Sequence, residues 1–357
     1  MKIALCVNID RDFWQGRRVL LTGHTGFKGS WLALWLQSLG AAVTGVSGGV
    51  PTRPSLYELA QVGSDMQEAE LDVRDQAAVV EALARWRPEV VFHLAAQPMV
   101  RRSLREPALT YEVNVMGTVN VLEAARRTGG VRAVVVVTSD KCYENPAGSS
   151  ARFTEADALG GDDPYSSSKA CAELVAAAYR RSFFAHQGAP MLATARAGNV
   201  IGGGDWGEDR LLADVVRAIE AGRPALVRNP GAVRPWQHVL SPLGGYLLLA
   251  QALWDGPWAA RAWNFGPREE DERTVGWVLE RMRSLWADRL SWVLDEGPNP
   301  PEAGHLALDS SAAERELGWT PACDLDSALR MVVEWHRAHL AGRPMREVSL
   351  GQIHSLA

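Results

Sequence analysis

The first residues that could do chemistry are a tyrosine and a lysine four positions apart, Tyr165 and Lys169, in the stretch DPYSSSK at 163–169. At this spacing on a helix both side chains lie on one face. A neighbouring ammonium favours the phenolate, so we expect Lys169 to lower the pKa of Tyr165 from about 10 towards neutrality. Such pairs also occur on solvated helices, so this one indicates a catalytic base only if a cofactor site surrounds it.

A second group of reactive side chains follows the β-branched run 133–137 (AVVVV), which predicts a central parallel strand. Directly after it come Thr138, Ser139, Asp140 and Lys141. In a doubly wound sheet, ligands bind beyond the carboxyl ends of the strands. The sequence therefore places a hydroxyl, an acid and an amine at the crevice, although a polar strand exit would use the same residue types.

A glycine-rich turn near the N-terminus supplies the surrounding cofactor site. An apolar strand at 18–22 leads into it, and a helix at 30–39 and a strand at 42–46 follow. Glycines in this context let the backbone approach a pyrophosphate, which the amides at the helix N-terminus can bind. The candidate cofactor residues of the turn are Gly23, Thr25, Gly26, Phe27, Lys28 and Gly29.

The adenosine end of this site is less clearly marked. The second strand ends in VSGGV at 46–50, without the acidic residue that usually holds the ribose, so the choice between NAD and NADP stays open on this point. Arg53 could meet a ribose phosphate or be a solvated loop residue. Asp72 and Val73 follow another predicted strand, where Asp72 could face the adenine or cap a helix.

The strand at 90–94 ends in small residues that would let a cofactor approach the backbone; Leu94, Ala95 and Ala96 are the candidates. We interpret His93 as a packed or hydrogen-bonded structural residue. Asn114 lies in a helix predicted at 108–127, inside an apolar pattern where an amide needs a partner, and is interpreted as a structural hydrogen bonder near the site.

The composition bounds the function. The chain has 357 residues, of which 47% are hydrophobic, with 37 basic against 42 acidic residues and no basic run. This balance argues against nucleic acid or an anionic membrane as a partner. The four cysteines have neither disulfide nor metal-ligand spacing, so no metal is expected and a reducing cytoplasm fits. The apolar start is too short for a signal core or a span.

These patterns predict an α/β fold: a Rossmann-like doubly wound parallel sheet with a smaller mixed α/β C-terminal substrate lobe. The expected division is an N-terminal extension at 1–16, an NAD-binding domain at 17–200, a mostly substrate-binding lobe at 201–345 and a C-terminal tail at 346–357. The two lobes are expected to be interwoven. Further helices are predicted at 165–184, 210–221, 244–254, 275–286 and 325–340, with strands at 191–197 and 262–265.

Over about residues 16–339 these motifs resemble the extended short-chain dehydrogenase/reductase family. The marks are TGxxGxxG at 22–29, the Tyr165 and Lys169 pair, and Ser139 on the preceding strand end. Within the family, the blocks at 23–32, 138–143, 196–206 and 234–239 are most similar to the 4,6-dehydratases that act on CDP-glucose. The resemblance implies bound NAD, oxidation of CDP-glucose at carbon 4, loss of water across carbons 5 and 6, and hydride return to carbon 6. The product would be CDP-4-keto-6-deoxyglucose, for deoxysugar biosynthesis.

The resemblance also implies roles. Tyr165 would take the proton of the 4-hydroxyl, Ser139 would hydrogen-bond that oxygen, and Lys169 would bind the nicotinamide ribose. Asp140 would protonate the departing 6-hydroxyl, which requires a raised pKa. Lys141 stands where dehydratases acting on other nucleotide sugars carry a glutamate, so it would be the base for carbon 5, or would orient the sugar or an acid.

At the other end of the substrate, Asn199 and Arg234 match positions that in this family approach the nucleotide diphosphate. Arg210 is expected to bind the substrate as well. Trp206 and Trp236 could stack on cytosine or pack between the lobes. The resemblance also implies a homodimer or homotetramer, with dimerisation through helices 108–127 and 165–184. The alternatives are a nucleotide-sugar 4-epimerase, a dehydratase acting on another nucleotide sugar and, more distantly, a non-catalytic dinucleotide-sensing protein.

Overall fold

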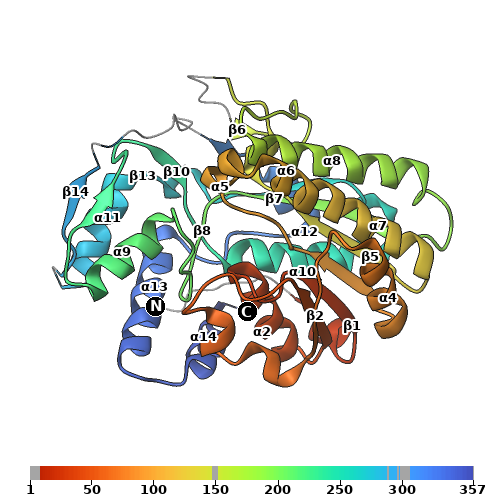
Figure 1. Ribbon diagram of the computed structural model, residues 1–357, viewed down its shortest axis with the longest axis horizontal. Helices are drawn as coiled ribbons and strands as arrows, with labels where there is room; N and C mark the ends of the chain where they lie inside the picture. Colours follow the sequence, from red (N-terminus) through yellow and green to blue (C-terminus); the bar gives the residue numbers. More distant parts are fainter. Residues whose placement is uncertain (1–8, 147–151, 288, 296, 298–305, 357) are drawn as a thin grey trace.

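A seven-stranded parallel sheet forms the centre of the protein (Figure 1). The computed structural model describes residues 9–146, 152–287, 289–295, 297 and 306–356. In spatial order the strands are β12 (Ala262–Phe265), β7 (Met191–Ala197), β5 (Ala133–Val137), β4 (Val90–His93), β1 (Arg18–Thr22), β2 (Ala42–Ser47) and β3 (Gln67–Glu70). Every pairing in it is parallel. The order reverses between β1 and β4, the crevice where such folds bind ligands.

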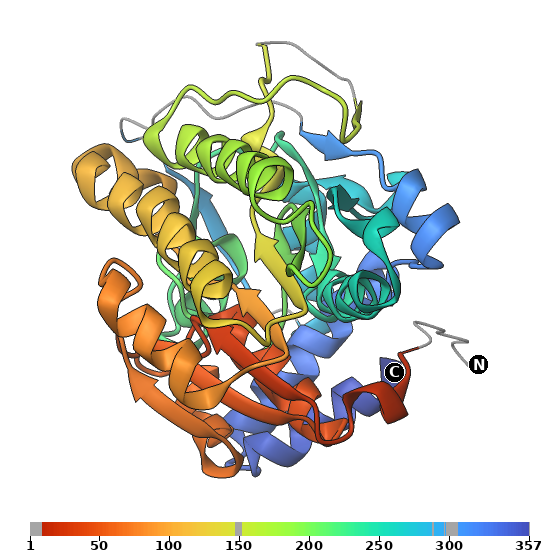
Figure 2. The same cartoon turned by 90° about the vertical axis from the view of Figure 1, so that its right-hand side faces the viewer.

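Both faces of the sheet are covered by helices (Figure 2). Alternate strand residues serve opposite faces, as a pleated strand requires. On β5, Val134 and Val136 pack with one hydrophobic cluster, and Val135 and Val137 with the other. The first face carries α4 (Gln76–Trp86), α7 (Gly117–Thr128) and α8 (Pro164–Ser182), and the second carries α2 (Phe27–Ser38) and α10 (Leu240–Asp255). The predicted fold class is thereby confirmed.

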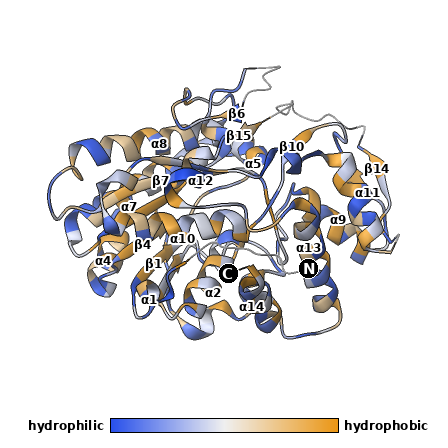
Figure 3. Ribbon diagram, turned by 180° about the vertical axis from the view of Figure 1, so that it is seen from behind, coloured by the Kyte–Doolittle hydropathy of each residue, from blue (hydrophilic) through white to orange (hydrophobic). Residues whose placement is uncertain are grey.

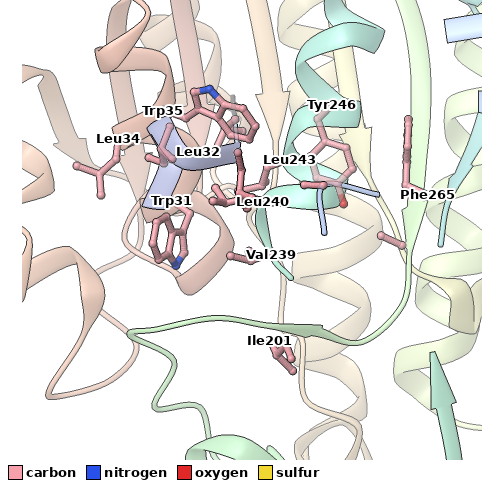
Figure 4. Packing of buried hydrophobic residues seen from close by; sticks show 14 of the residues in the cluster. Trp31, Leu32, Leu34, Trp35, Ile201, Val239, Leu240, Leu243, Tyr246 and Phe265 are labelled. Carbon is pink, nitrogen blue, oxygen red and sulfur yellow. The ribbon is translucent and has the colours of Figure 1, made fainter. Parts of the chain in front are cut away.

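The larger hydrophobic cluster lies between the sheet and α2 and α10. Trp31 and Trp35 of α2 are fully buried there, facing Leu243 of α10 across the cluster (Figure 4). Helix α2 is apolar on all sides because its far side is covered by α14 (Met345–Leu356). Figure 3 shows apolar residues along α2 and α10, interspersed with polar ones, in the view from behind. These helices therefore hold the glycine turn rigidly against the sheet.

A smaller lobe stands beside the carboxyl ends of the strands (Figure 1). It contains α9 (Leu211–Glu220), α11 (Val275–Leu285), α13 (Leu325–Leu340) and the paired strands β9 (Ala225–Val227) with β14 (Trp292–Leu294) and β10 (Val233–Pro235) with β13 (Glu272–Thr274). Two further pairs, β8 (Val200–Ile201) with β11 (Gln237–His238) and β6 (Arg152–Phe153) with β15 (Ala307–Leu308), join segments distant in sequence. Between these elements the chain returns to the main sheet through α10 and β12, so the lobes are interwoven.

Helix α2 begins at Phe27, three residues before the predicted 30, and two other helices differ more from their predicted bounds. The helix predicted at 108–127 is divided into α6 (Pro107–Tyr111), a π-helical segment (Glu112–Met116) and α7. The π-helical turn contains Asn114, whose buried side chain donates a hydrogen bond to Ser168 of α8. Helix α10 begins at Leu240, four residues before the predicted 244, because Pro242 falls within its first turn, where no amide donor is needed.

The described parts of both chain ends pack against the helices of the main domain. Trp14, in α1 (Arg11–Trp14), is fully buried and its indole nitrogen donates to Oε1 of Gln251 on α10. Residues 1–8 and 357 lie outside the described residues. At the other end, α14 lies on α2, and Arg346 donates to the side chain of Gln37. In the described part of the chain no helix combines the length and apolar character needed to cross a membrane.

Three further α-helices are short: α3 (Leu56–Leu59), α5 (Val100–Arg105) and α12 (Ser311–Leu317).

Candidate active site

The glycine turn has the geometry of an anion cradle. A Cβ at Gly29 would lie 2.1 Å from the carbonyl oxygen of Gly23, and one at Gly23, where φ is +75°, would lie 2.8 Å from the nitrogen of Ala95. Only glycine fits these positions. Gly26 is the N-cap of α2 and provides no side-chain cap, so the first amides of the helix remain open to an anion. The turn therefore fits the pyrophosphate of a dinucleotide.

Hydroxyl groups occupy the end of β2, where an acid was missing from the sequence. Thr25 Oγ1 lies 2.6 Å from Ser47 Oγ and donates to the carbonyl oxygen of Gly49, also at 2.6 Å. Arg53, which could have met a ribose phosphate, is 80% exposed and pairs with Glu58. The arginine is therefore engaged in a surface ion pair.

The predicted adenine residues lie beside an open hollow. Asp72 pairs with Arg74, with 2.6 Å between Oδ2 and Nη2, and this hydrogen bond lowers the pKa of the Asp72 carboxyl. Val73 is buried against Gly117. A cavity of about 510 Å³ is lined by Asp72, Arg74, Asp75, Glu112, Met116 and Asn120. Neither Ser139 nor Tyr165 lines this hollow.

The end of β4 is held by hydrogen bonds to Thr22. Its Oγ1 accepts the amides of Leu94 and Ala95, each at 3.1 Å, and lies 2.8 Å from Nδ1 of His93. Ala96 follows, half-buried like Leu94 and Ala95. The ring of His93 also contacts Thr118, and burial lowers its pKa to about 3. His93 is thus a neutral structural residue, as predicted.

Asn114 connects this strand end to α8. Its Oδ1 accepts the amide of Gln97, while its Nδ2 donates to the carbonyl oxygen of Gln97 and to Ser168 Oγ. Since Ser168 lies between Tyr165 and Lys169, the amide fixes the helix that carries the pair. The prediction that Asn114 is a structural hydrogen bonder is confirmed.

Tyr165 and Lys169 lie buried on one face of α8, but the expected pKa relationship is not observed. Burial raises the pKa of Tyr165 to about 12, against a hydrogen bond with Ser139 that lowers it. The ammonium of Lys169 donates instead to the carbonyl oxygen of Val137 at 3.2 Å, and burial lowers its pKa to about 8. The prediction of a lowered tyrosine pKa is wrong for this state of the protein because desolvation of the phenol outweighs its favourable interactions.

Ser139 and Asp140 lie next to each other at the end of β5. Ser139 Oγ donates to Asp140 Oδ1 at 3.0 Å and accepts the amide of Lys141 at 3.2 Å. Asp140 is buried, and desolvation raises the pKa of its carboxyl, against the lowering effects of Lys141 and Ser139. The raised pKa of Asp140 agrees with the expectation for a carboxylic acid that donates a proton.

A small cavity joins Asp140 to the second lobe. It is lined by Asp140, Lys141, Asn199, Arg234, Pro235 and Leu306. Two of the three expected diphosphate residues therefore share a cavity with the expected acid and base. The close approach depends on Gly198, where a Cβ would lie 2.5 Å from Oδ2 of Asp140.

Arg210 and Lys28 lie near the same groups. Arg210 pairs with Asp205 at 2.7 Å, and its guanidinium lies 5.9 Å from the ring centre of Phe27. Lys28 Nζ donates to the hydroxyl of Tyr246 on α10 at 3.5 Å. Burial, followed by the charge of Arg210, lowers the pKa of Lys28 to about 7.

Tyr246 and Gly198 are site residues that the sequence did not indicate. Tyr246 is fully buried within an apolar helix, where its spacing indicates only core packing. Burial, and after it the charges of Tyr165 and Asp140, raise the pKa of the Tyr246 hydroxyl. Gly198 stood inside a recognised block, yet the reason for a glycine there is the Asp140 carboxyl, which comes from another strand.

The two tryptophans considered for cytosine pack inside the protein. Trp206 lies edge-on to Trp335 and His336 of α13. Trp236 is buried, and its indole nitrogen donates to the carbonyl oxygen of Arg273. Packing between elements of the smaller lobe therefore accounts for both rings.

Comparison with known proteins agrees with this geometry. The model of the NAD dependent epimerase/dehydratase family matches residues 19–257. The chain belongs to this family. Among relatives, a CDP-glucose 4,6-dehydratase from Salmonella typhimurium is 48% identical over 351 residues, covering 96% of this chain and 98% of that protein. A dTDP-glucose 4,6-dehydratase from Neisseria meningitidis serogroup B is 26% identical over 344 residues, 90% of this chain and 93% of that protein.

Solved structures show the same architecture. A dTDP-glucose 4,6-dehydratase from Streptomyces venezuelae, with NAD and TYD bound, superposes with a TM-score of 0.75 at 26% identity, covering 92% of this chain and 99% of that chain. A UDP-glucose 4-epimerase from Thermotoga maritima has a TM-score of 0.79 at 23% identity, covering 90% and 99%, and shows the shared fold. The cofactor of the NAD dependent epimerase/dehydratase family is NAD, and the turn at Gly23, Gly26 and Gly29 fits it.

Proposed function

We propose that this protein converts CDP-glucose to CDP-4-keto-6-deoxyglucose by an internal redox dehydration. The observation that carries the proposal is the buried Asp140 carboxyl with a raised pKa, next to Lys141 in the cavity that Asn199 and Arg234 also line. Epimerisation at carbon 4 needs no acid for a leaving hydroxyl at carbon 6. The 48% identity to a CDP-glucose 4,6-dehydratase over nearly the whole chain supports the choice of nucleotide.

The first step is oxidation of the sugar at carbon 4. NAD, when bound, supplies the hydride acceptor at this step and the hydride donor at the last one. Tyr165 takes the proton of the 4-hydroxyl, and Ser139, its hydrogen-bond partner, binds the same oxygen. Because burial raises the pKa of Tyr165 to about 12, positive charge at the site has to favour the phenolate during this step.

The second step is loss of water across carbons 5 and 6. A ketone at carbon 4 acidifies the proton on carbon 5. Asp140 gives its proton to the departing 6-hydroxyl, and the raised pKa of its carboxyl favours the protonated form that this step requires. Lys141, in the same cavity, removes the proton from carbon 5. When the hydride returns to carbon 6, Lys141 gives the proton back to carbon 5, which restores the saturated sugar.

The diphosphate of the substrate is assigned to Asn199, Arg210 and Arg234. A guanidinium can bind two phosphate oxygens at once, and an amide nitrogen can donate to a third. Asn199 and Arg234 line the cavity that holds Asp140, and Arg210 is close enough to influence the pKa of Tyr165. Binding at these residues sets the sugar between α8 and the smaller lobe.

The test is incubation of the purified protein with CDP-glucose in deuterated water, followed by mass spectrometry and proton NMR. Dehydration predicts loss of one water and deuterium at carbon 5. An unchanged hexose mass with inversion at carbon 4 would identify a 4-epimerase instead. Parallel incubations with dTDP- and GDP-glucose identify the nucleotide, because only CDP-glucose is expected to be turned over efficiently.

A homodimer through α8 and the helical segments that contact it is the second part of this proposal. Apolar side chains are exposed on α5, α6, the π-helical segment and α8, which adjoin one another (Figure 1). They are Leu104, Tyr111, Met116 and Leu174, with exposures of 51%, 38%, 50% and 58%. Covering such a patch would stabilise a dimer.

The thiols of Cys142, Cys171 and Cys323 are free, which fits the proposed cytoplasmic location.

Sedimentation velocity tests the dimer with a matched pair of substitutions. Leu174→Glu places a charge in the patch and is expected to give a monomer. Leu226→Glu, equally exposed at 58% but on β9 in the smaller lobe, is expected to leave the dimer intact. A monomeric mass for the unaltered protein at micromolar concentration would contradict the dimer.

A further inference from the structure

A buried ion pair lies directly behind the catalytic segment. Glu173 of α8 and Arg196 of β7 are joined by a 2.8 Å contact between Oε2 and Nη2, and their side chains are only 3% and 4% exposed. Glu173 follows Lys169 by four residues, on the same helix face as Tyr165 and Lys169. Neither residue has a part in the proposed proton transfers.

The two carboxylate oxygens of Glu173 bind different strands. Oε1 accepts a hydrogen bond from Thr138 Oγ1 at 2.5 Å, and Thr138 is the residue before Ser139. Oε2 accepts from Thr194 Oγ1 at 2.7 Å and from Arg196. One carboxylate therefore connects the helix of Tyr165 and Lys169 to the end of β5 and to the middle of β7.

Arg196 holds the other end of the same segment. Its Nη1 donates to the hydroxyl of Tyr143 at 2.7 Å, and that hydroxyl donates to Oδ1 of Asn264 on β12, also at 2.7 Å. Tyr143 directly follows the short helical turn Asp140–Cys142. The ion pair thus binds both ends of the segment 138–143. Glu173 accepts a hydrogen bond from Thr138, and Arg196 donates one to Tyr143.

Energetic considerations indicate that this arrangement does more than stabilise the fold. Burying two charges costs free energy that offsets much of their attraction, and apolar residues of similar volume often stabilise a protein as well. An ion pair with several hydrogen bonds, in contrast, has one preferred geometry. Proton transfer and hydride transfer depend steeply on such geometry.

We propose that Glu173 and Arg196 are positioning residues that set Ser139 and Asp140 at the correct distance from Tyr165. The carboxylate fixes the strand end relative to the helix, and the guanidinium fixes Tyr143, which directly follows the turn that contains Asp140 and Lys141. This inference rests on the proposed dehydration, since it assigns the pair to the same site. It adds two residues that touch neither substrate nor cofactor.

Two threonine substitutions test the proposal against a purely structural role. Thr138→Val and Thr194→Val each remove one hydroxyl donor from the same carboxylate, and both positions are buried. Only Thr138 adjoins Ser139. We expect Thr138→Val to lower kcat for CDP-glucose by about tenfold or more with KM nearly unchanged, and Thr194→Val to change kcat by less than about twofold. Thermal unfolding of both variants measures their structural cost.

The possible outcomes separate the inference from the proposed function. If unaltered protein does not dehydrate CDP-glucose, the proposed function fails, whatever the variants do. If it does, and both variants lose kcat equally or neither loses it, the positioning role is overturned. Should Thr138→Val not fold, Tyr143→Phe removes the hydroxyl contact on the opposite side of the segment and is expected to lower kcat by about tenfold with the same unchanged KM. Full kcat in that variant would also overturn the proposal.

Discussion

The ammonium of Lys169 donates a hydrogen bond to the carbonyl oxygen of Val137, 3.2 Å away, at the end of the strand that leads to Ser139. A buried helix lysine is thereby tied to the backbone of the catalytic strand. The cost of this arrangement is visible in the pKa of Lys169, which burial lowers from 10.5 to about 8. Keeping the Lys169 ammonium charged beside Tyr165 therefore lowers the free energy of unfolding of the protein.

Replacing Lys169 by methionine is expected to remove a pH-dependent destabilisation. The pKa of Lys169 is about 8 folded and 10.5 unfolded, so between these values the unfolded chain binds more protons and stability rises with pH. The stability gained by Lys169→Met over the unaltered protein is thus largest below pH 8 and shrinks towards pH 10.5. Between pH 8 and pH 10.5 the difference in unfolding free energy between the two proteins falls by roughly 3 kcal/mol. Urea unfolding of both proteins across this pH range, without nucleotides, measures it.

Lys28→Met serves as the control for this measurement. Burial lowers the pKa of Lys28 further, to about 7. The stability gained by Lys28→Met over the unaltered protein is therefore expected to begin shrinking about one pH unit lower than for Lys169→Met. An advantage of Lys169→Met that stays constant from pH 7 to pH 10.5 would show that the buried amine is not desolvated as described.

Loss of the Tyr165 hydroxyl is expected to stop the reaction at its first step. Tyr165→Phe removes the proton acceptor for the 4-hydroxyl and should lower kcat by roughly 10²–10⁴-fold. Tyr179→Phe, on the same helix but with its hydroxyl directed to Glu123, is expected to retain activity. The measurement is the rate of ketosugar formation for both variants. Equal rates would contradict a catalytic Tyr165.

Asp140→Asn is expected to separate oxidation from dehydration. An amide of the same shape cannot give a proton to the departing 6-hydroxyl, so water loss should fall by roughly 10²-fold or more. Oxidation at carbon 4 does not need this proton and should continue. Reduced cofactor would then accumulate, as followed by its near-ultraviolet absorbance during a single turnover. Normal product release without such accumulation would exclude Asp140 as the acid.

Lys141→Met tests the assignment of the base. The substitution removes the amine from the cavity lined by Asp140 and Asn199 but leaves the residues of the first step in place. Deuterium incorporation at carbon 5 should be lost in deuterated water, while reduced cofactor should still form. If exchange at carbon 5 survives, another group removes that proton and Lys141 orients the sugar or Asp140.

Local sequence patterns predicted the parts of this protein whose structure depends on neighbouring residues. The turn containing Gly23, Gly26 and Gly29 was recognisable because a tight backbone turn before a helix restricts residue type over a few positions. The run 133–137 and the Tyr165 and Lys169 spacing were readable for the same reason. Together with the resemblance of the longer blocks, these patterns led to the correct family and fold.

Tertiary structure decided the features that join distant segments. Lys28 meets Tyr246 from the apolar helix α10, and Gly198 makes room for the carboxyl of Asp140. No local spacing relates such residues, because each contact depends on how the strands and helices pack.

The same distinction explains the one error in the expected chemistry. The sequence by itself determined that Tyr165 and Lys169 share a helix face, since helical periodicity fixes that relationship. Only the tertiary structure decided how far that face is buried from water and that Lys169 donates its hydrogen bond to the carbonyl oxygen of Val137. Desolvation depends on every group packed around the phenol, and it raises the pKa of Tyr165 where the adjacent lysine alone would lower it.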